Sequence, residues 1–324
     1  MTAPLILIPE NPCPAGADPQ WLMTPDGTRL RMVTWAPQAA GLTRCRGSIF
    51  LFGGRTEFAE KYFEVIGELL ARDFAVTTLD WRGQGLSDHP LPDWRKGHID
   101  HFETYLADMV PFMAAMEGQM PKPWFALAHS MGGHILQRAL HDHPDWFSGA
   151  VMTAPMFGLR LGSANVQKLL RGVAELACAL GLGGSYVPGG DASAADAVPF
   201  KDNSITNCEA RYGIHQALIR AEWKLGLGAP TMNWLRAAFR SMALASDKAY
   251  LNAITTPVLI LEATQEGLVD NLSLERAATL MRAAEIDTIQ ESRHEILMEE
   301  DACRIAFWSD FDIFIAKAED RLKP

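Results

Sequence analysis

The sequence predicts an α/β fold in which a mostly parallel central sheet has helices on both faces and carries an inserted helical cap. Short apolar runs alternate with segments of helical periodicity between residues 47 and 154. Residues 156–250 are largely helical and lack a clear strand, and a buried strand returns at 257–261. We therefore expect two parts of one core, residues 1–155 and 251–324, with a cap or lid at 156–250 between them.

The elements before the cap follow from local patterns of apolar and turn-forming residues. A Pro25-Asp26-Gly27 turn joins two short runs into a hairpin. A proline in a helix interior removes a backbone hydrogen bond, so we expect an interruption or kink at Pro111. In chain order the predictions are a hairpin at 21–35, strands at 47–52, 75–79, 124–128 and 150–153, and helices at 57–72, 101–117 and 131–141.

The cap and the second part of the core are predicted in the same way. Residues 163–180 carry an apolar stripe at helical spacing, which predicts packing onto the core or a lid face that lines an acyl pocket or touches lipid. The glycine-rich stretch 180–190 is expected to be a mobile loop. After the strand at 257–261, we expect a last short strand near 288–289 and a C-terminal helix at about 302–317.

The composition predicts an ordinary soluble globular protein. Hydrophobic residues make up 48% of the 324 residues, and charged residues make up 21%. The net charge of −10 disfavours nucleic acid as a partner and weakens electrostatic docking to anionic membranes. The five cysteines are scattered, so neither a disulfide framework nor a zinc site is expected. We find no pattern of a signal peptide, cofactor site or protein partner, and we expect a cytoplasmic protein.

The segment Ala128-His129-Ser130-Met131-Gly132 lies between a predicted strand and a predicted helix. It matches the nucleophile elbow G-x-S-x-G, with alanine at the first small position. The turn needs small residues on both sides of the serine because they pack against neighbouring backbone. Ser130 would then lie at the carboxyl end of the sheet, with the Met131 N–H placed to stabilise an oxyanion. The alternative is a serine that only caps an ordinary helix.

Longer motifs add a resemblance to a known family. They are Gly53-Gly-Arg-Thr-Glu-Phe-Ala-Glu-Lys-Tyr62, Leu79-Asp-Trp-Arg-Gly-Gln-Gly-Leu-Ser-Asp88, the elbow itself, Pro230-Thr-Met-Asn-Trp-Leu-Arg-Ala-Ala-Phe-Arg240 and Arg293-His-Glu-Ile-Leu-Met-Glu299. With these motifs the chain resembles bacterial lysophospholipases, within the monoacylglycerol-lipase-like group of α/β-hydrolases. The resemblance implies the α/β-hydrolase fold and hydrolysis of carboxylic esters, with a small ester or a monoacyl lipid as substrate.

A serine nucleophile needs a base and an acid, which in this fold follow it in the order Ser, Asp or Glu, His. His294 lies in a loop before the last helix, so we predict it as the base, with a structural loop histidine as the alternative. Glu266 stands where the family usually has the aspartate of Gly-x-Asp-Arg, and Asp270 is the alternative acid. Glutamate is one methylene longer than aspartate but can still orient an imidazole.

The remaining histidines receive other predictions. His129 occupies the variable position of the elbow and is expected to tune the pocket, whereas His134 is expected to point away from the carboxyl edge of the sheet. His141 and His143 could suggest a metal, but a solvated helix end is favoured, and no metal site is predicted.

By resemblance, the backbone N–H of Arg55 is the second oxyanion donor, beside that of Met131. The family usually has His-Gly at Gly53-Gly54, so this loop is expected to be more flexible here. The cap is expected to make transient contact with a membrane surface. The candidates for substrate binding are Gly54, His129, Leu169, Leu170, Val173, Trp223, Met232 and Trp234.

These observations favour an esterase or lipase that acts on monoacyl lipids, lysophospholipids or similar small esters. An aminopeptidase-like amidase of the same fold would need an acidic anchor in the cap, for which Glu209 and Glu222 are candidates. A binding-only protein that has lost turnover is a second alternative, because a fold alone does not determine function. A dehalogenase with an aspartate nucleophile is disfavoured, because Ser130 occupies the elbow.

Overall fold

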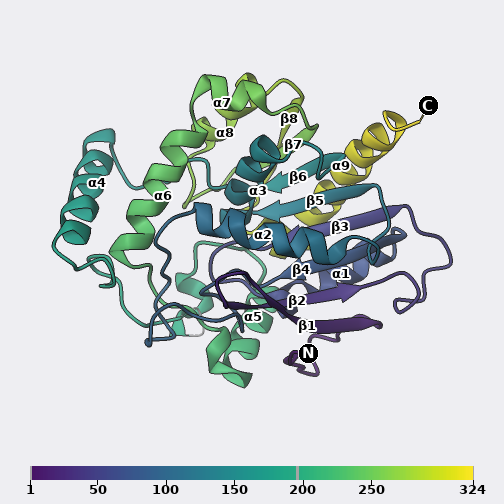
Figure 1. Ribbon diagram of the computed structural model, residues 1–324, viewed down its shortest axis with the longest axis horizontal. Coiled ribbons are helices and arrows are strands. Elements are labelled where there is room, and N and C mark those ends of the chain that lie inside the picture. The colour runs from purple at the N-terminus through teal and green to yellow at the C-terminus, as the bar shows by residue number, and fades with distance from the viewer. Residues whose placement is uncertain (1, 195–196, 324) are drawn as a thin grey trace.

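The computed structural model describes residues 2–194 and 197–323, and its centre is an eight-stranded sheet (Figure 1). The strand order across the sheet is β1-β2-β4-β3-β5-β6-β7-β8. The strands are β1 (Ala17–Met23), β2 (Arg29–Trp35), β3 (Gly47–Phe52), β4 (Phe74–Leu79), β5 (Trp124–His129), β6 (Gly149–Thr153), β7 (Val258–Ala263) and β8 (Ala284–Ile289).

The six strands from β4 to β8 in this order are parallel, and the predicted hairpin supplies the antiparallel edge. β1 pairs with β2, and β2 pairs antiparallel with β4. The pairs from β3 with β4 through β7 with β8 are all parallel. Every residue of β3, β4, β5 and β6 is buried, as expected for strands covered on both faces. The predicted α/β fold is therefore confirmed.

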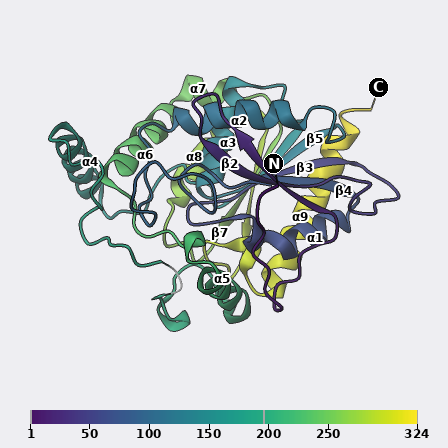
Figure 2. The same cartoon turned by 60° about the horizontal axis from the view of Figure 1, so that its bottom comes forward.

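Helices cover both faces of the sheet (Figure 2). One face carries α1 (Phe63–Leu70) and α9 (Asp301–Asp320), and the other carries α2 (Glu103–Met116), α3 (Met131–Asp142) and α8 (Asn271–Leu280). Alternate residues of β3 serve the two cores, because successive strand side chains point to opposite faces. Phe50 and Phe52 pack toward α2 and α3, and Ile49 and Leu51 pack toward α1 and α9.

The segment between β6 and β7 consists of helices joined by loops, and its described residues include no strand of the sheet. Its main helices are α4 (Ala164–Ala179), α5 (Glu209–Ala221), α6 (Met232–Ala245) and α7 (Lys248–Ala253). α4 is the outermost of these and lies against α6, away from the sheet (Figure 1). The glycine-rich stretch between α4 and α5 is tied to the start of α6 by a bridge between Tyr186 and Thr231. No helix in the described part of the chain is long and apolar enough to cross a bilayer.

Several predicted boundaries differ from the structure. The helix predicted at 57–72 is a 3-10 turn, η1 (Ala59–Tyr62), followed by α1. The predicted interruption at Pro111 is wrong, because α2 continues through it to Met116. The carbonyl that loses its partner there belongs to Ala107, which is exposed and can bond to water. β8 begins at Ala284, earlier than predicted, because this edge strand has an alternating polar sequence rather than an apolar run.

Candidate active site

Ser130 lies at the sharp turn from β5 into α3. Its backbone has φ 50° and ψ −116°, a strained combination for a residue with a side chain. A Cβ atom at Gly132 would lie 2.4 Å from the carbonyl oxygen of Phe52, so only glycine fits there. Ala128 is buried and pairs with Phe52 across β3 and β5. These contacts hold the serine at the carboxyl end of the sheet, in the conformation of a nucleophile elbow.

A continuous line of hydrogen bonds joins Ser130 to two residues from the second part of the core. His294 Nε2 lies 2.9 Å from Ser130 Oγ, and His294 Nδ1 lies 2.8 Å from Glu266 Oε2. Because Nδ1 faces a carboxylate, it carries the ring proton, and Nε2 is left to accept the proton of the serine hydroxyl. The geometry is that of a nucleophile, a base and an acid that orients the base.

The carboxyl group of Glu266 is held on both of its oxygens. Oε2 faces His294, and Oε1 accepts hydrogen bonds from the N–H groups of Leu268 at 2.7 Å and Val269 at 3.2 Å. Burial alone would raise the pKa of Glu266, but the hydrogen bond and charge of His294 and the two backbone donors outweigh it and lower that pKa. Glu266 is therefore ionised at neutral pH, as an acid that orients imidazole must be.

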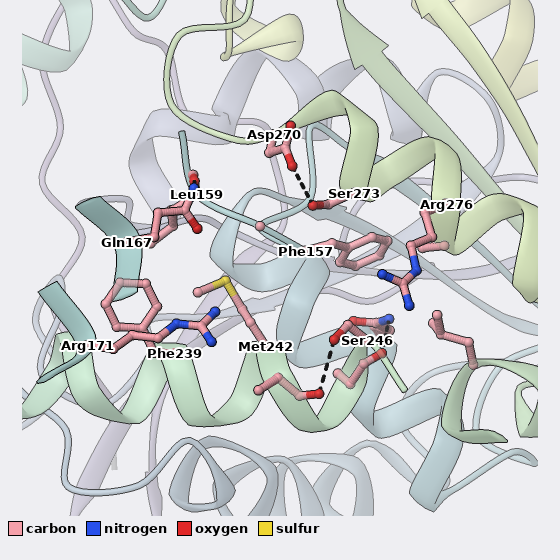
Figure 3. Close-up of a pocket in the computed structure, with 16 residues that line it drawn as sticks. Phe157, Leu159, Gln167, Arg171, Phe239, Met242, Ser246, Asp270, Ser273 and Arg276 are labelled. Carbon is pink, nitrogen blue, oxygen red and sulfur yellow. Dashed lines mark hydrogen bonds between the residues drawn. The ribbon is translucent and has the colours of Figure 1, made fainter. Parts of the chain in front are cut away.

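Asp270, the alternative acid, lies elsewhere. It lines a separate cavity of about 250 Å³ between α4, α6 and α8, where its Oδ2 accepts a hydrogen bond from Ser273 Oγ at 2.7 Å (Figure 3). Asp270 is also the residue that precedes α8. The structure therefore brings Glu266, and not Asp270, to His294. Glu266 reaches the base because its extra methylene extends from a loop whose own backbone N–H groups grip the carboxylate.

The loop after β3 packs closely against the serine. A Cβ at Gly54 would lie 3.0 Å from both Ser130 Cβ and Glu57 Oε2, so a larger residue at this position would press on the serine. Among the described residues, the backbone N–H groups of Arg55 and Met131 find no protein acceptor, which leaves both free for a substrate oxygen. Both belong to the segments predicted to form an oxyanion hole.

Buried side chains hold this loop, although it lacks the histidine usual in the family. Trp81 Nε1 donates to the Gly53 carbonyl at 2.8 Å, and the Gly54 N–H donates to Glu57. Two residues after Gly54, the Thr56 N–H donates to Gln84 Oε1 at 2.6 Å. The loop is thus restrained at the two peptide groups on either side of the one that contains the Arg55 N–H.

A buried ionic cluster, absent from the sequence-based predictions, lies beneath the site. Lys61 Nζ lies 2.8 Å from Glu57 Oε1 and 2.6 Å from Glu295 Oε1, and all three side chains are almost completely buried. Burial alone would raise the pKa of Glu57, but Lys61 and His129 lower it to about 2. The spacing of Glu57 and Lys61 along a helical turn is a signal in the sequence for their pairing. Nothing local signals Glu295, which is 234 positions from Lys61.

His129 lies between this cluster and the base. Its Nδ1 is 3.1 Å from the carbonyl oxygen and from Oγ1 of Thr153, and its ring centre is 4.8 Å from that of His294. Burial lowers the pKa of His129 to about 4, so its imidazole is neutral at pH 7. A neutral ring beside His294 allows the imidazolium of the base to form without a second positive charge next to it.

A cavity of about 450 Å³ opens directly on Ser130 and His294. Among the predicted substrate-binding residues, His129, Leu170 and Trp234 line it. Its remaining apolar wall comes from residues that the sequence did not single out, namely Met156, Leu159, Leu161, Val187, Ile205, Leu235, Leu268 and Val269. A mostly apolar chamber with a few polar groups at one end is the form expected of a binding site for an acyl chain.

Five of the predicted substrate-binding residues do not line this cavity. Gly54 packs behind Ser130, and Met232 is buried in the core. Trp223 is exposed, with Arg95 above its ring. Leu169 and Val173 lie on the outer face of α4 and point to solvent.

The apolar stripe of α4 faces outward because a neighbouring, smaller-residue face meets α6. Ala174 is buried, and Leu170, Ala177 and Cys178 are partly buried against the core. Small side chains let α4 approach α6 closely, so helix packing selects this face. The prediction that the stripe packs onto the core holds for Leu170 and is wrong for its other five members. Val166, Leu169, Val173, Leu176 and Leu180 are exposed.

The other histidines have structural partners. His134 is buried, and its Nε2 lies 2.7 Å from Ser241 Oγ. His141 stacks on Tyr250 and His143 stacks on Trp146, with ring centres 3.6 Å and 3.9 Å apart. In residues 2–194 and 197–323, no group of three or more potential ligands could hold a metal ion.

The chain is similar to one protein family and to several known proteins. Residues 43–301 match the family described as serine aminopeptidase, S33. Lysophospholipase L2 of Escherichia coli (strain K12) is 33% identical over 283 residues, which cover 81% of this chain and 78% of that protein. Probable lysophospholipase L2 of Haemophilus influenzae is 30% identical over 260 residues, 80% of each chain. A solved structure of a soluble variant of monoglyceride lipase from Saccharomyces cerevisiae shares the fold, with a TM-score of 0.69 and 18% identity over 93% of this chain and 96% of that chain.

Proposed function

This chain belongs to the serine aminopeptidase S33 family and is a carboxylic ester hydrolase, and on that premise we propose that it cleaves the acyl ester of lysophospholipids, with Ser130 as nucleophile. The observation that carries the proposal is the hydrogen-bonded line from Ser130 through His294 to Glu266, which opens into an apolar cavity. A line of this kind activates a hydroxyl, and a chamber of this kind suits an acyl chain.

The proposed reaction proceeds through an acyl-enzyme. Ser130 Oγ attacks the ester carbonyl carbon while its proton passes to His294 Nε2, and the carbonyl oxygen becomes an oxyanion. The N–H groups of Arg55 and Met131 stabilise that oxyanion. The C–O bond to the alcohol then breaks, and the alcohol leaves with the proton from His294. His294 then takes a proton from water as the water oxygen attacks the acyl carbonyl carbon, and it gives this proton to Ser130 Oγ as the bond between Oγ and the acyl group breaks and the fatty acid leaves. Glu266 orients His294 and stabilises its imidazolium in both halves.

We also propose that residues 156–250 act as a cap between core parts 1–155 and 251–324. Leu170, Val187 and Trp234 from this segment line the cavity together with Ser130 and His294 from the core. This arrangement supports a model in which the core residues catalyse the reaction and the cap residues bind the acyl chain. Each additional methylene that the cavity accepts contributes about 0.8 kcal/mol to binding.

The exposed apolar face of α4 supports contact with a membrane surface, from which monoacyl lipids would enter. Five large apolar side chains share this face, and Leu169 and Leu176 are 66% and 61% exposed. Co-sedimentation with phosphatidylcholine vesicles tests the contact. Leu169→Asp with Leu176→Asp should reduce the bound fraction, whereas Leu272→Asp on α8, 71% exposed, is the matched control. Equal binding by both variants would refute the contact.

For the location of the protein we propose the cytoplasm. All five cysteines lie in the described residues and are free thiols, and several are accessible or partly so. Scattered free thiols fit a reducing compartment. An attached fluorescent reporter and fractionation would test this, and recovery with an oxidising compartment would refute it.

The amidase alternative lacks the group it requires. Glu209 and Glu222, its candidate anchors for a free amine, lie outside the cavity. The two glutamates that do line it, Glu57 and Glu295, are already paired with Lys61. Because both carboxylates already bind a buried ammonium group, neither is free to anchor a substrate amine.

The test of the proposed function combines labelling with turnover. A fluorophosphonate probe should label the protein, and Ser130→Ala should abolish both labelling and fatty acid release from lysophosphatidylcholine. Thr153→Ser, a conservative change next to the site, is the control for folding. Labelling that persists in Ser130→Ala, or lysophospholipid left intact by the labelled wild-type protein, would refute the proposal.

A further inference from the structure

Arg55 lines the active-site cavity, and its positively charged side chain lies beside Trp234, which lines the same cavity. Among the described residues that line the cavity, it is the one arginine or lysine. Its Nη2 donates to the Gly228 carbonyl, and its Cζ lies 5.6 Å from the centre of the Trp234 ring. A side chain at Gly97 would collide with the guanidinium. Backbone groups and an aromatic ring therefore hold this charge in one place.

Within the described part of the chain, no carboxylate pairs with Arg55. The carboxylates in the same cavity wall, Glu57 and Glu295, bind Lys61 instead. Arg55 Nε is buried and has no hydrogen-bond partner among the described residues. Burial lowers the pKa of Arg55 to about 10, and the group is still charged at neutral pH. Because an unpaired, partly buried charge is costly, an anion supplied by the substrate would be strongly favoured here.

We propose that the Arg55 guanidinium binds the phosphate of the lysophospholipid headgroup while the ester lies at Ser130, an inference that rests on the proposed function. The planar guanidinium matches the oxygens of a phosphate and can donate two parallel hydrogen bonds to it. A monoacylglycerol has only a neutral hydroxyl at the corresponding position. Arg55 therefore selects lysophospholipids over monoacylglycerols.

The dimensions of the substrate suit this arrangement. In the proposed reaction, the backbone N–H of Arg55 donates to the carbonyl oxygen of the ester. In a lysophospholipid acylated at the primary hydroxyl, the phosphorus lies as many bonds from the ester carbonyl carbon as the guanidinium carbon lies from the Arg55 backbone nitrogen. One residue can thus contact the oxyanion with its main chain and the phosphate with its side chain. The same loop would align the scissile ester bond and bind the phosphate of the headgroup.

The kinetic test compares two lipids with the same acyl chain, lauroyl lysophosphatidylcholine and monolauroylglycerol. The readout is the kcat/KM for the lysophospholipid divided by the kcat/KM for the monoacylglycerol. An effect of the substitution on the oxyanion loop would change both values equally and would leave this ratio unchanged. Arg55→Met should lower this ratio about tenfold to a hundredfold, the effect of losing a charged hydrogen bond. Arg55→Lys should restore much of the ratio. Arg171→Met is the matched control, because Arg171 also lies over an aromatic ring, Phe239, but lines the separate cavity.

A binding measurement keeps the test independent of turnover. In a Ser130→Ala background, calorimetry would compare a hydrolysis-resistant ether lysophosphatidylcholine with a monoalkylglycerol of equal chain length. Adding Arg55→Met should raise the Kd of the phospholipid at least tenfold more than that of the glycerol lipid. An ether lysophosphatidylglycerol, which has the phosphate but no amine, should respond in the same way, and a response confined to the choline lipid would overturn the assignment to phosphate.

The outcomes separate the two proposals. If Arg55→Met lowers kcat/KM equally for both lipids and leaves their relative Kd unchanged, the phosphate site is refuted while the proposed function stands. If the wild-type protein hydrolyses neither lipid, the proposed function fails, and the binding measurement alone decides the phosphate site. A thermal unfolding midpoint within a few degrees of wild type confirms that each variant is folded.

Discussion

Replacing Glu266 with glutamine is the most direct test of the acid. The main-chain N–H groups of Leu268 and Val269 both donate to Oε1, at 2.7 Å and 3.2 Å. In Glu266→Gln these donors would retain the amide oxygen, so the amide NH₂ would face His294 Nδ1 at the present 2.8 Å contact. An NH₂ group donates, and Nδ1 would then have to accept. The ring proton moves to Nε2, where it points at Ser130 and prevents the base from accepting the serine proton.

The expected loss follows from this change of tautomer. Removing the negative charge from the acid while keeping its shape lowers kcat by about 10⁴ in the best-studied serine enzyme, which corresponds to about 5.5 kcal/mol in the barrier. We expect a loss of similar order here, because the contacts of Glu266 leave its amide no alternative orientation. Stability should change far less, since the substitution preserves the side-chain volume and the two backbone hydrogen bonds.

The assay is the steady-state hydrolysis of a soluble nitrophenyl ester, with kcat corrected for the active fraction by fluorophosphonate titration. Asp270→Asn is the matched control, because it makes the same chemical change four residues away, at a carboxylate that bonds to Ser273. It should alter kcat by less than about threefold, in line with the loss of one local hydrogen bond. A mild Glu266→Gln variant together with a crippled Asp270→Asn variant would refute the assignment.

Three further predictions concern the cavity, the elbow and the buried cluster. Leu170→Ser should reduce the preference for long over short acyl esters by about fivefold, because it removes about 1 kcal/mol of apolar contact with the acyl chain. Leu169→Ser on the outer face of α4 should change this preference less than about twofold in the absence of vesicles. Equal effects of the two substitutions would contradict the placement of the cavity. Gly132→Ala should prevent the native turn and lower the unfolding midpoint strongly, whereas Gly172→Ala, with nothing within 4 Å of the new Cβ, should stabilise α4 by about 0.5–1 kcal/mol in denaturant unfolding. Lys61→Met should lower the free energy of unfolding by about 3–5 kcal/mol near neutral pH, because it leaves two buried carboxylates unpaired. The loss should be smaller near pH 5, where these carboxylates begin to be protonated. A loss that does not depend on pH would contradict this cause.

The pKa shifts of Lys61 and Glu57 determine how the stability contributed by the wild-type cluster depends on pH. Burial alone would lower the pKa of Lys61, but Glu295 and Glu57 raise it, so its contribution to stability is full below its unfolded pKa and is lost only as pH rises through the raised folded value. Glu57 has a folded pKa of about 2, below its unfolded value of 4.5, so its contribution is present above the unfolded value and is lost as pH falls toward 2. Lys61 and Glu57 therefore contribute to stability across the neutral range, whereas burial raises the pKa of Glu295, whose contribution falls as pH rises through that raised value.

The parts of the site that depend on local sequence could be predicted. The elbow requires small residues at fixed distances from Ser130, and the chain order of the fold leaves His294 as the base after the penultimate strand. The sheet follows from apolar runs that alternate with helical periodicity. The choice between Glu266 and Asp270 could only be narrowed, because it depends on which carboxylate the backbone of the loop turns toward the base.

The sequence predicts that the cap is helical, but it does not predict which face of each cap helix meets the rest of the protein. An apolar stripe identifies a helix face, but the face that meets the protein is determined by the partner helix. In α4, the small residues Ala174 and Ala177 allow close approach to α6 and leave the larger Leu169 outside. Leu170 and Leu169 are adjacent in sequence and equal in composition, yet one lines the cavity and the other faces solvent. Only the tertiary arrangement distinguishes them.

The buried cluster compensates for one departure from the family pattern, the missing histidine in the loop after β3. The loop at Gly53-Gly54 lacks the usual histidine, yet the Gly54 N–H is held by Glu57, whose other oxygen binds Lys61. Lys61 also binds Glu295, the neighbour of the base His294. One buried ammonium group therefore connects the loop that carries one proposed oxyanion donor with the segment that carries the proposed base. Both glutamates bind Lys61, and among the described residues Arg55 in the same wall has no carboxylate partner. The residue that organises the catalytic loop thus also leaves the positive charge available to an anionic headgroup.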